Sequence, residues 1–208
     1  EKEITMTLST TFRFDISAAD TAGAEVGFTS NELTVETVSG APAAKEPFNV
    51  TYTAYSPATL PVAFEAPEGW IAEETDGAAF TLSEPDAQTK DGQPGVIRID
   101  AVPVGEDYSV SQLAQEIKQR LSAIGSSQSF TEWNPSLTAT RRIMGSMGVY
   151  ANYSGTLDTG VKVGGRLHAT TIDHVLYCVQ ITYPLAYKDD FMEVFKQLRE
   201  TIQYVGYE

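Results

Sequence analysis

Apolar and polar residues alternate over several short stretches of the chain. Within the first 56 residues this alternation recurs four times, and many of the neighbouring residues are Thr, Ser and Val. A period of two with β-branched neighbours is typical of strands that bury one face. We therefore expect strands around residues 4–8, 12–16, 33–35 and 48–52, separated by loops at 18–27 and 39–47.

A helical period replaces the alternation at residues 110–124. Ser109 followed by Gln112 forms a capping box where this helix would begin. Gly125 is the residue type that commonly follows a last helical turn, so we expect the helix to end there. The apolar residues recur at steps of one, three and four along a single stripe: Val110, Leu113, Ala114, Ile117, Leu121 and Ile124.

A second helix is predicted at residues 187–202. Asp189 and Asp190 fall in its first turn and Arg199 near its end, which suits the helix dipole. Pro184 stands just before it and ends the preceding strand. The apolar stripe of this helix consists of Phe191, Val194, Phe195, Leu198 and Ile202.

Strands account for most of the remaining chain. A type I turn is predicted at residues 66–69, and a hairpin turn at Asp173-His174. The expected strands lie at residues 62–65, 80–82, 96–104, 130–133, 137–143, 148–157, 161–171 and 175–183.

The last of these strands has two different faces. One face is apolar throughout and is expected in the core: Val175, Tyr177, Val179, Ile181 and Tyr183. The opposite face is only half apolar, with Leu176, Cys178, Gln180 and Thr182. This second face lacks an obvious cover, and a segment of 56 residues is short for a core of its own. We therefore expect the N-terminal strands to dock on the rest of the chain.

Together the elements predict an α+β fold. Residues 57–208 would form an antiparallel β-sheet flanked by two main helices, and residues 1–56 a β-rich extension docked on this domain. No apolar run approaches the roughly 20 residues of a membrane-spanning helix, so no transmembrane segment is expected.

Charge narrows the classes of partner. The net charge is −14, and residues 1–108 hold 19 acidic and 5 basic residues, whereas residues 109–208 hold 9 of each. Nucleic-acid binding requires clustered Lys and Arg, and the one adjacent basic pair is Arg141-Arg142. We expect a protein or cell-envelope partner and no nucleic acid; the sequence gives no indication of oligomeric state.

Cysteine use and the first residues suggest a location outside the cytoplasm. The single cysteine, Cys178, excludes an intramolecular disulfide. The sequence begins Glu1-Lys2-Glu3 without Met, as it would after removal of a signal peptide. We expect an extracytoplasmic protein, either a membrane-anchored lipoprotein or a secreted one; a lipobox cysteine before Glu1 would establish the anchor.

A search for catalytic, cofactor-binding and metal-binding residues assigns none. Cys178 lies in an apolar strand and is expected to be a small buried hydrophobe. His168 and His174 flank the predicted hairpin turn with Asp173, but no third or fourth zinc ligand has suitable spacing, and His168 is expected on a strand surface. Other patterns fall short of their motifs: Ser146, the acidic pairs 73–74 and 189–190, and the polar loop 86–92.

From residue 57 onward the order of elements resembles the PsbP-like superfamily, including exported bacterial lipoproteins of the DcrB type. The resemblance rests on the turn Pro67-Glu68-Gly69-Trp70, the helix at 110–124, and the hairpin running into Tyr183-Pro184 before a closing helix. It implies an antiparallel sheet with flanking helices and a role in binding or assembly rather than catalysis. The leading hypothesis is thus an exported, non-enzymatic binding or assembly domain. The alternatives are a hydrolase whose site forms only in the fold and a small-ligand carrier.

Overall fold

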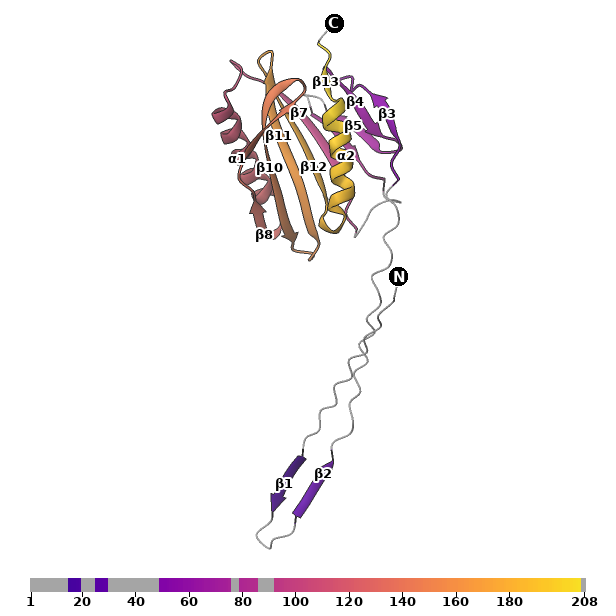
Figure 1. Cartoon of the computed structure of the whole chain (residues 1–208), viewed down its shortest axis with the longest axis vertical. Coiled ribbons are helices and arrows are strands. Elements are labelled where there is room, and N and C mark those ends of the chain that lie inside the picture. The colour runs from indigo at the N-terminus through magenta and orange to yellow at the C-terminus, as the bar shows by residue number, and fades with distance from the viewer. Residues whose placement is uncertain (1–14, 20–24, 30–48, 76–78, 86–91, 207–208) are drawn as a thin grey trace, which may run out of the picture. The chain divides into compact units, whose positions relative to one another are not determined.

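A sheet of eight antiparallel strands forms the framework of residues 48–208 (Figure 1). The computed structural model describes residues 15–19, 25–29, 49–75, 79–85 and 92–206. Along the sheet the strands follow the order β5 (Ile71–Thr75), β6 (Ala79–Ser83), β7 (Val96–Pro103), β12 (Val175–Pro184), β11 (Lys162–Ile172), β10 (Ser146–Leu157) and β8 (Phe130–Pro135), with β9 (Ala139–Ile143) also paired to β10.

The three longest strands form consecutive hairpins in the middle of this sheet. The turn between β11 and β12 is formed by Asp173 and His174, with φ of 51° and 62°. Two successive positive φ values suit a two-residue hairpin turn that follows the twist of the strands. The hairpin predicted at this dipeptide is therefore confirmed.

One face of the sheet is covered by α2 (Lys188–Thr201) and by a smaller sheet in the order β13 (Gln203–Tyr204), β4 (Val62–Pro67) and β3 (Tyr52–Tyr55). Figure 1 shows α2 lying over β12, between this strand and the smaller sheet. A short 3-10 helix, η2 (Leu185–Tyr187), connects β12 to α2. The predicted apolar faces meet here, because Tyr177, Val179 and Ile181 pack in one cluster with Phe191 and Phe195.

The opposite face of the sheet is covered by α1 (Val110–Ser127). Leu113, Ile117 and Leu121 of the predicted stripe are buried against Leu176 and Cys178 of β12. The two helices thus lie on opposite faces. The expectation that the second face lacks a cover is wrong, because α1 crosses to that face after β7.

The boundaries of α1 follow packing as well as local signals. The capping box of Ser109 and Gln112 is present as predicted. The helix continues past Gly125, however, and ends at Ser127. A Cβ atom at position 125 would lie 2.7 Å from Nε1 of Trp133, so the glycine provides room for the indole rather than a helix end.

Two turns and loops differ from their predicted positions. The turn after β4 comes one residue later than predicted: Gly69 has φ of 81°, and the N–H of Trp70 donates to the carbonyl of Pro67 at 3.3 Å. In the N-terminal unit, residues 1–47, β1 (Asp15–Ala19) pairs antiparallel with β2 (Glu25–Thr29). Residues 18–19 and 25–27 therefore lie in strands, because pairing within the hairpin outweighs their weak strand propensity.

The rest of the pattern predicted for residues 1–48 lies outside the described residues. Residues 52–55, which the alternation places in the N-terminal extension, form β3 and pair with β4. Neither helix of the described chain is long and apolar enough to cross a membrane.

Candidate functional site

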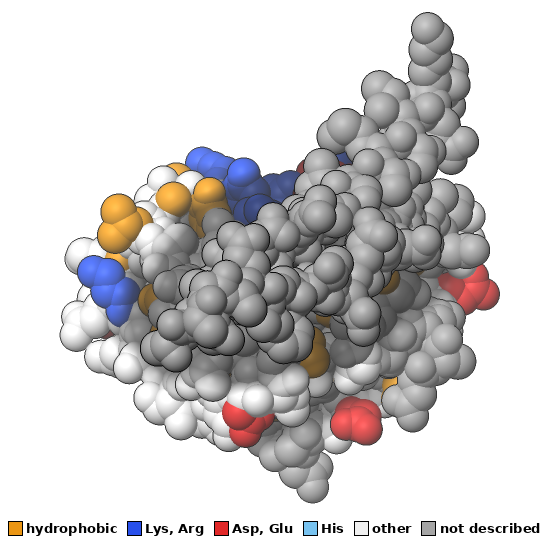
Figure 2. Space-filling model, turned by 90° about the horizontal axis from the view of Figure 1, so that it is seen from below, with side chains coloured by type: hydrophobic (Ala, Val, Ile, Leu, Met, Phe, Trp, Pro, Cys, Tyr) orange, Lys and Arg blue, Asp and Glu red, His pale blue; other side chains and the backbone are white. Residues whose placement is uncertain are grey.

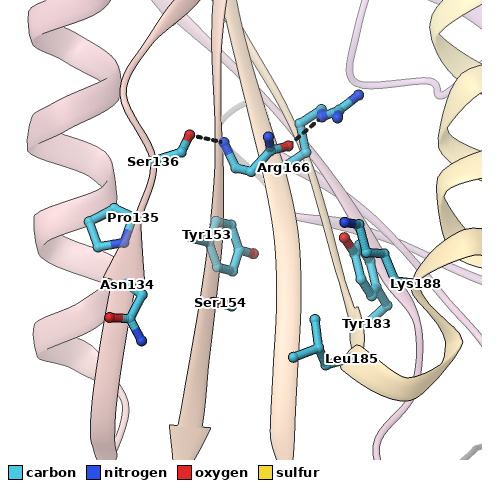
Figure 3. Close-up of a pocket in the computed structure, with 10 residues that line it drawn as sticks. Asn134, Pro135, Ser136, Tyr153, Ser154, Arg166, Tyr183, Leu185 and Lys188 are labelled. Carbon is cyan, nitrogen blue, oxygen red and sulfur yellow. Dashed lines mark hydrogen bonds between the residues drawn. The ribbon is translucent and has the colours of Figure 1, made fainter.

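A pocket of about 310 Å³ lies on the face of the sheet that carries α2, beside the start of that helix (Figure 3). Arg166 alternates along β11 with Leu167, which packs towards α1, and this alternation directs Arg166 to the α2 side. Figure 3 shows residues of β8 on one side of the pocket and Tyr183, Leu185 and Lys188 on the other. The lining residues are Asn134, Pro135, Ser136, Asn152, Tyr153, Ser154, Arg166, Tyr183, Leu185 and Lys188.

Small residues on the central strands leave space for the pocket. Ser154 of β10 lies opposite Gly164 of β11 in the strand register. A Cβ atom at Gly164 would lie 2.9 Å from side-chain atoms of both Leu185 and Tyr183. Glycine at this position thus allows these two side chains to stand close to the strand and form one wall.

Arg166 is held in place by neutral groups only. Its Nε donates to Oδ1 of Asn152 at 2.7 Å, and the backbone N–H of Asn152 donates to Oγ of Ser136 at 2.9 Å. Across the described part of the chain, neither Arg166 nor Lys188 forms an ion pair. The pocket therefore carries positive charge that no protein carboxylate neutralises.

The positive charge continues next to the pocket around Tyr150. The guanidinium carbons of Arg141 and Arg166 lie 5.1 and 5.0 Å from the centre of the Tyr150 ring, within the range of cation–π contacts. Burial and the nearby charge of Arg141 lower the pKa of Arg166. Figure 2 shows Lys and Arg side chains gathered on one side of the molecule, while most of the visible Asp and Glu side chains lie elsewhere.

His168 lies beneath this cluster and is fully buried. Its ring stacks on Tyr150 with centres 5.1 Å apart and contacts Phe195 at 5.5 Å. Neither ring nitrogen has a hydrogen-bond partner among the described residues. Burial, and then the charges of Arg166, Arg141 and Arg199, lower the pKa of His168 to about 3. The predicted strand-surface position is thus wrong: α2 and Tyr150 enclose this histidine, which is neutral near pH 7.

The two histidines do not meet. His174 is exposed at the hairpin turn, where its backbone N–H donates to Oδ1 of Asp107 at 3.0 Å. His168 precedes it by six residues of strand, about 20 Å at the usual rise. Within the described ranges, no three His, Cys, Asp or Glu side chains converge in a way that would hold a metal ion.

The remaining sequence candidates have structural roles. Cys178 is buried as predicted, and loss of hydration raises the pKa of its thiol to about 12. Glu74 accepts the backbone N–H groups of Ala58 and Thr59 at 3.0 and 2.9 Å, and these bonds lower its pKa. The pair 189–190 belongs to the first turn of α2, and most of the loop 86–92 lies outside the described residues.

Comparison with solved structures identifies the fold. Cyanobacterial PsbP (CyanoP) from Synechocystis sp. PCC 6803 superposes with a TM-score of 0.57 at 14% identity, over 80% of this chain and 98% of that chain. The chain has a PsbP-like fold. LpqN, involved in cell envelope biogenesis of Mycobacterium tuberculosis, superposes with a TM-score of 0.53 at 12% identity, over 74% and 90% of the two chains.

The comparison establishes the PsbP-like fold and does not extend to a function. No protein-family model and no curated protein sequence matches the chain. The predicted likeness to DcrB-type lipoproteins stays a prediction.

The basic pocket is the feature that the sequence pattern missed. One local signal was present, because Arg166 and His168 stand two residues apart in a strand that is otherwise apolar or small, and so share a face. Lys188 and Asn134 carry no such signal. They reach the pocket only through the order of the strands.

Proposed function

We propose that this chain is a non-enzymatic binding or assembly domain of the cell envelope, located outside the cytoplasm, and that it binds its partner at the pocket of Arg166 and Lys188. The observation that carries the proposal is the pair of cations in this pocket. Neither forms an ion pair in the described part of a chain whose net charge is −14.

The composition of the pocket favours binding over hydrolysis. Its lining contains no Asp, Glu, His or Cys, so it offers neither a paired-carboxylate site nor a nucleophile activated by histidine. A carrier of apolar ligands would use a cavity between the sheet and a helix. Instead, apolar side chains of α1 and α2 fill the two faces of the sheet that these helices cover.

The envelope location is supported by the likeness to LpqN, a protein of cell envelope biogenesis. It is also supported by the sequence features that suggest export. Attachment as a lipoprotein, or release as a secreted protein, would both place the pocket where envelope components can reach it.

Photo-cross-linking in the producing cells tests this proposal. A photoreactive residue at Asn134 would lie at the pocket, and one at Gln119 would lie on the exposed side of α1. We expect adducts with envelope components from position 134 that weaken in an Arg166→Gln background. Identical adducts from both positions, or adducts confined to cytoplasmic proteins, would contradict the proposal.

A further inference from the structure

We propose that the group bound in this pocket is a phosphate monoester carried by a hydroxyl-rich molecule, such as a sugar or polyol phosphate. This inference rests on the proposed binding function and names its ligand. It follows from the charge, the hydrogen-bonding groups and the size of the pocket.

The charge of the pocket suits an anion with more than one negative charge. Arg166 and Lys188 line it, and Arg141 stands over the same tyrosine ring as Arg166. Arg199, whose charge reaches Arg166, is already paired with Glu200 at 2.7 Å. A phosphate monoester carries about −1.5 to −2 at pH 7 and therefore matches the two lining cations better than a single carboxylate does.

Arg166 is prepared for such a ligand by its own hydrogen bond. Asn152 holds the Nε of Arg166 at 2.7 Å and so fixes the plane of the guanidinium group. No hydrogen bond from its two terminal nitrogens to another described residue is present. A planar guanidinium with free terminal N–H groups binds phosphate oxygens in a forked geometry, whereas Lys188 would act as a mobile point charge.

The rest of the lining suits the hydroxyl groups of the ligand. Asn134, Ser154 and Tyr183 offer an amide and two hydroxyl groups, and none of these side chains bonds to another described residue. Pro135 and Leu185 add apolar surface against which the C–H groups of a polyol can pack. At about 310 Å³ the pocket is at the lower end of the usual range of roughly 300–1,000 Å³, so one monosaccharide-sized unit would fill it.

Titration of the full chain with small probes tests the inference. Binding would be followed by isothermal calorimetry and by backbone NMR shifts, with glucose 6-phosphate, glycerol 3-phosphate, glucose, glucuronate and inorganic phosphate as probes. Arg166→Gln has Arg142→Gln as its matched control, because Arg142 is exposed and its one hydrogen bond runs to the carbonyl of Gly145. Lys188→Gln has Lys196→Gln as its control, since Lys196 is exposed on the same helix and pairs with Glu193.

We expect both sugar and glycerol phosphates to bind and to shift the signals of Ser154 and Arg166. Arg166→Gln should weaken this binding about tenfold, which corresponds to about 1.4 kcal/mol. Lys188→Gln should weaken it about two- to fivefold, because its ion pair would be more exposed. The two control variants should bind as the wild type does.

Several results would overturn the inference. These are binding of glucose or glucuronate as tight as that of glucose 6-phosphate, equal binding of inorganic phosphate, or equal losses in Arg142→Gln and Arg166→Gln. Flotation with vesicles containing phosphatidic acid, against phosphatidylcholine alone, separates a lipid-borne phosphate from a soluble one, and binding in either arm supports the proposal. If no probe binds while the cross-link from position 134 persists, the inference fails and the proposed function stands. Loss of the cross-link as well would reject both.

Discussion

Acid should destabilise this protein through His168. The folded chain buries the imidazole between Tyr150 and Phe195, close to the charges of Arg166, Arg141 and Arg199. Protonation would add a further positive charge to a site without a hydrogen-bond partner among the described residues. The fold therefore favours the neutral ring, whereas the unfolded chain takes up the proton below its ordinary pKa.

The size of the effect follows from the two pKa values. The pKa is about 3 in the folded chain and 6.5 in a free side chain. Because the folded value is the lower one, the stabilisation is fully present above about pH 6.5 and is lost as the pH falls towards 3. At 1.36 kcal/mol per pH unit the full loss is about 5 kcal/mol, and roughly 2.5–3 kcal/mol of it is lost by about pH 4.5.

Urea unfolding of the wild type and of His168→Phe measures this loss. Phenylalanine keeps an aromatic ring against Tyr150 and does not titrate. The free-energy advantage of the wild type over the variant should shrink by roughly 2.5–3 kcal/mol between about pH 7.5 and about pH 4.5. Titrating carboxylates affect both proteins equally and cancel in the comparison.

His174→Asn removes the other histidine and serves as the control. Asparagine tolerates the positive φ of 62° at that exposed turn, so this variant should keep the pH dependence of the wild type. Equal pH dependence of the wild type and His168→Phe would refute the idea that burial keeps this ring neutral.

Three further predictions concern packing. Ile117→Ala should lower the free energy of unfolding by roughly 2–5 kcal/mol, and an unchanged melting temperature would contradict the placement of α1. Gly125→Ala should cost about 1–3 kcal/mol and alter Trp133 fluorescence, whereas a gain in stability would show that the indole moves easily. Cys178 should react with a thiol reagent only after unfolding in guanidinium chloride; rapid reaction in the native protein would disprove its burial.

Local periodicity predicted what local periodicity can determine. The stripes of α1 and α2 and the core face of β12 each lie within one segment, so their spacing is written in consecutive residues. The side of the sheet that each helix covers depends instead on the path of the chain after β7 and after β12. The half-apolar face of β12 therefore left its cover undetermined, although α1 lies against it.

The errors at single residues have a similar origin. Gly125 has the identity of a helix end, but Trp133, which lies in the next strand, occupies the space beside it. His168 is buried by Tyr150 and Phe195, which precede it by 18 residues and follow it by 27. The pocket combines Asn134, Arg166 and Lys188 in the same way, from segments whose contact only the strand order creates.

The N-terminal segment remains the largest open prediction, and its energetics divide at residue 48. Residues 52–55 pair with β4, and the ring of Tyr55 lies 5.8 Å from Phe64 and 5.3 Å from Phe80. A fragment of residues 57–208 loses this strand and should be less stable than a fragment of residues 48–208 by at least the roughly 0.5–1.5 kcal/mol of each aromatic pair.

Docking of residues 1–47 is a separate prediction, because α1 already covers the face of the sheet that first suggested it. What still favours docking is length, since a two-stranded hairpin is marginally stable alone in water. The full chain should then melt at a higher temperature than residues 48–208. If the two melt together, residues 1–47 form a separate unit, and the drop should appear only on further shortening to residue 57.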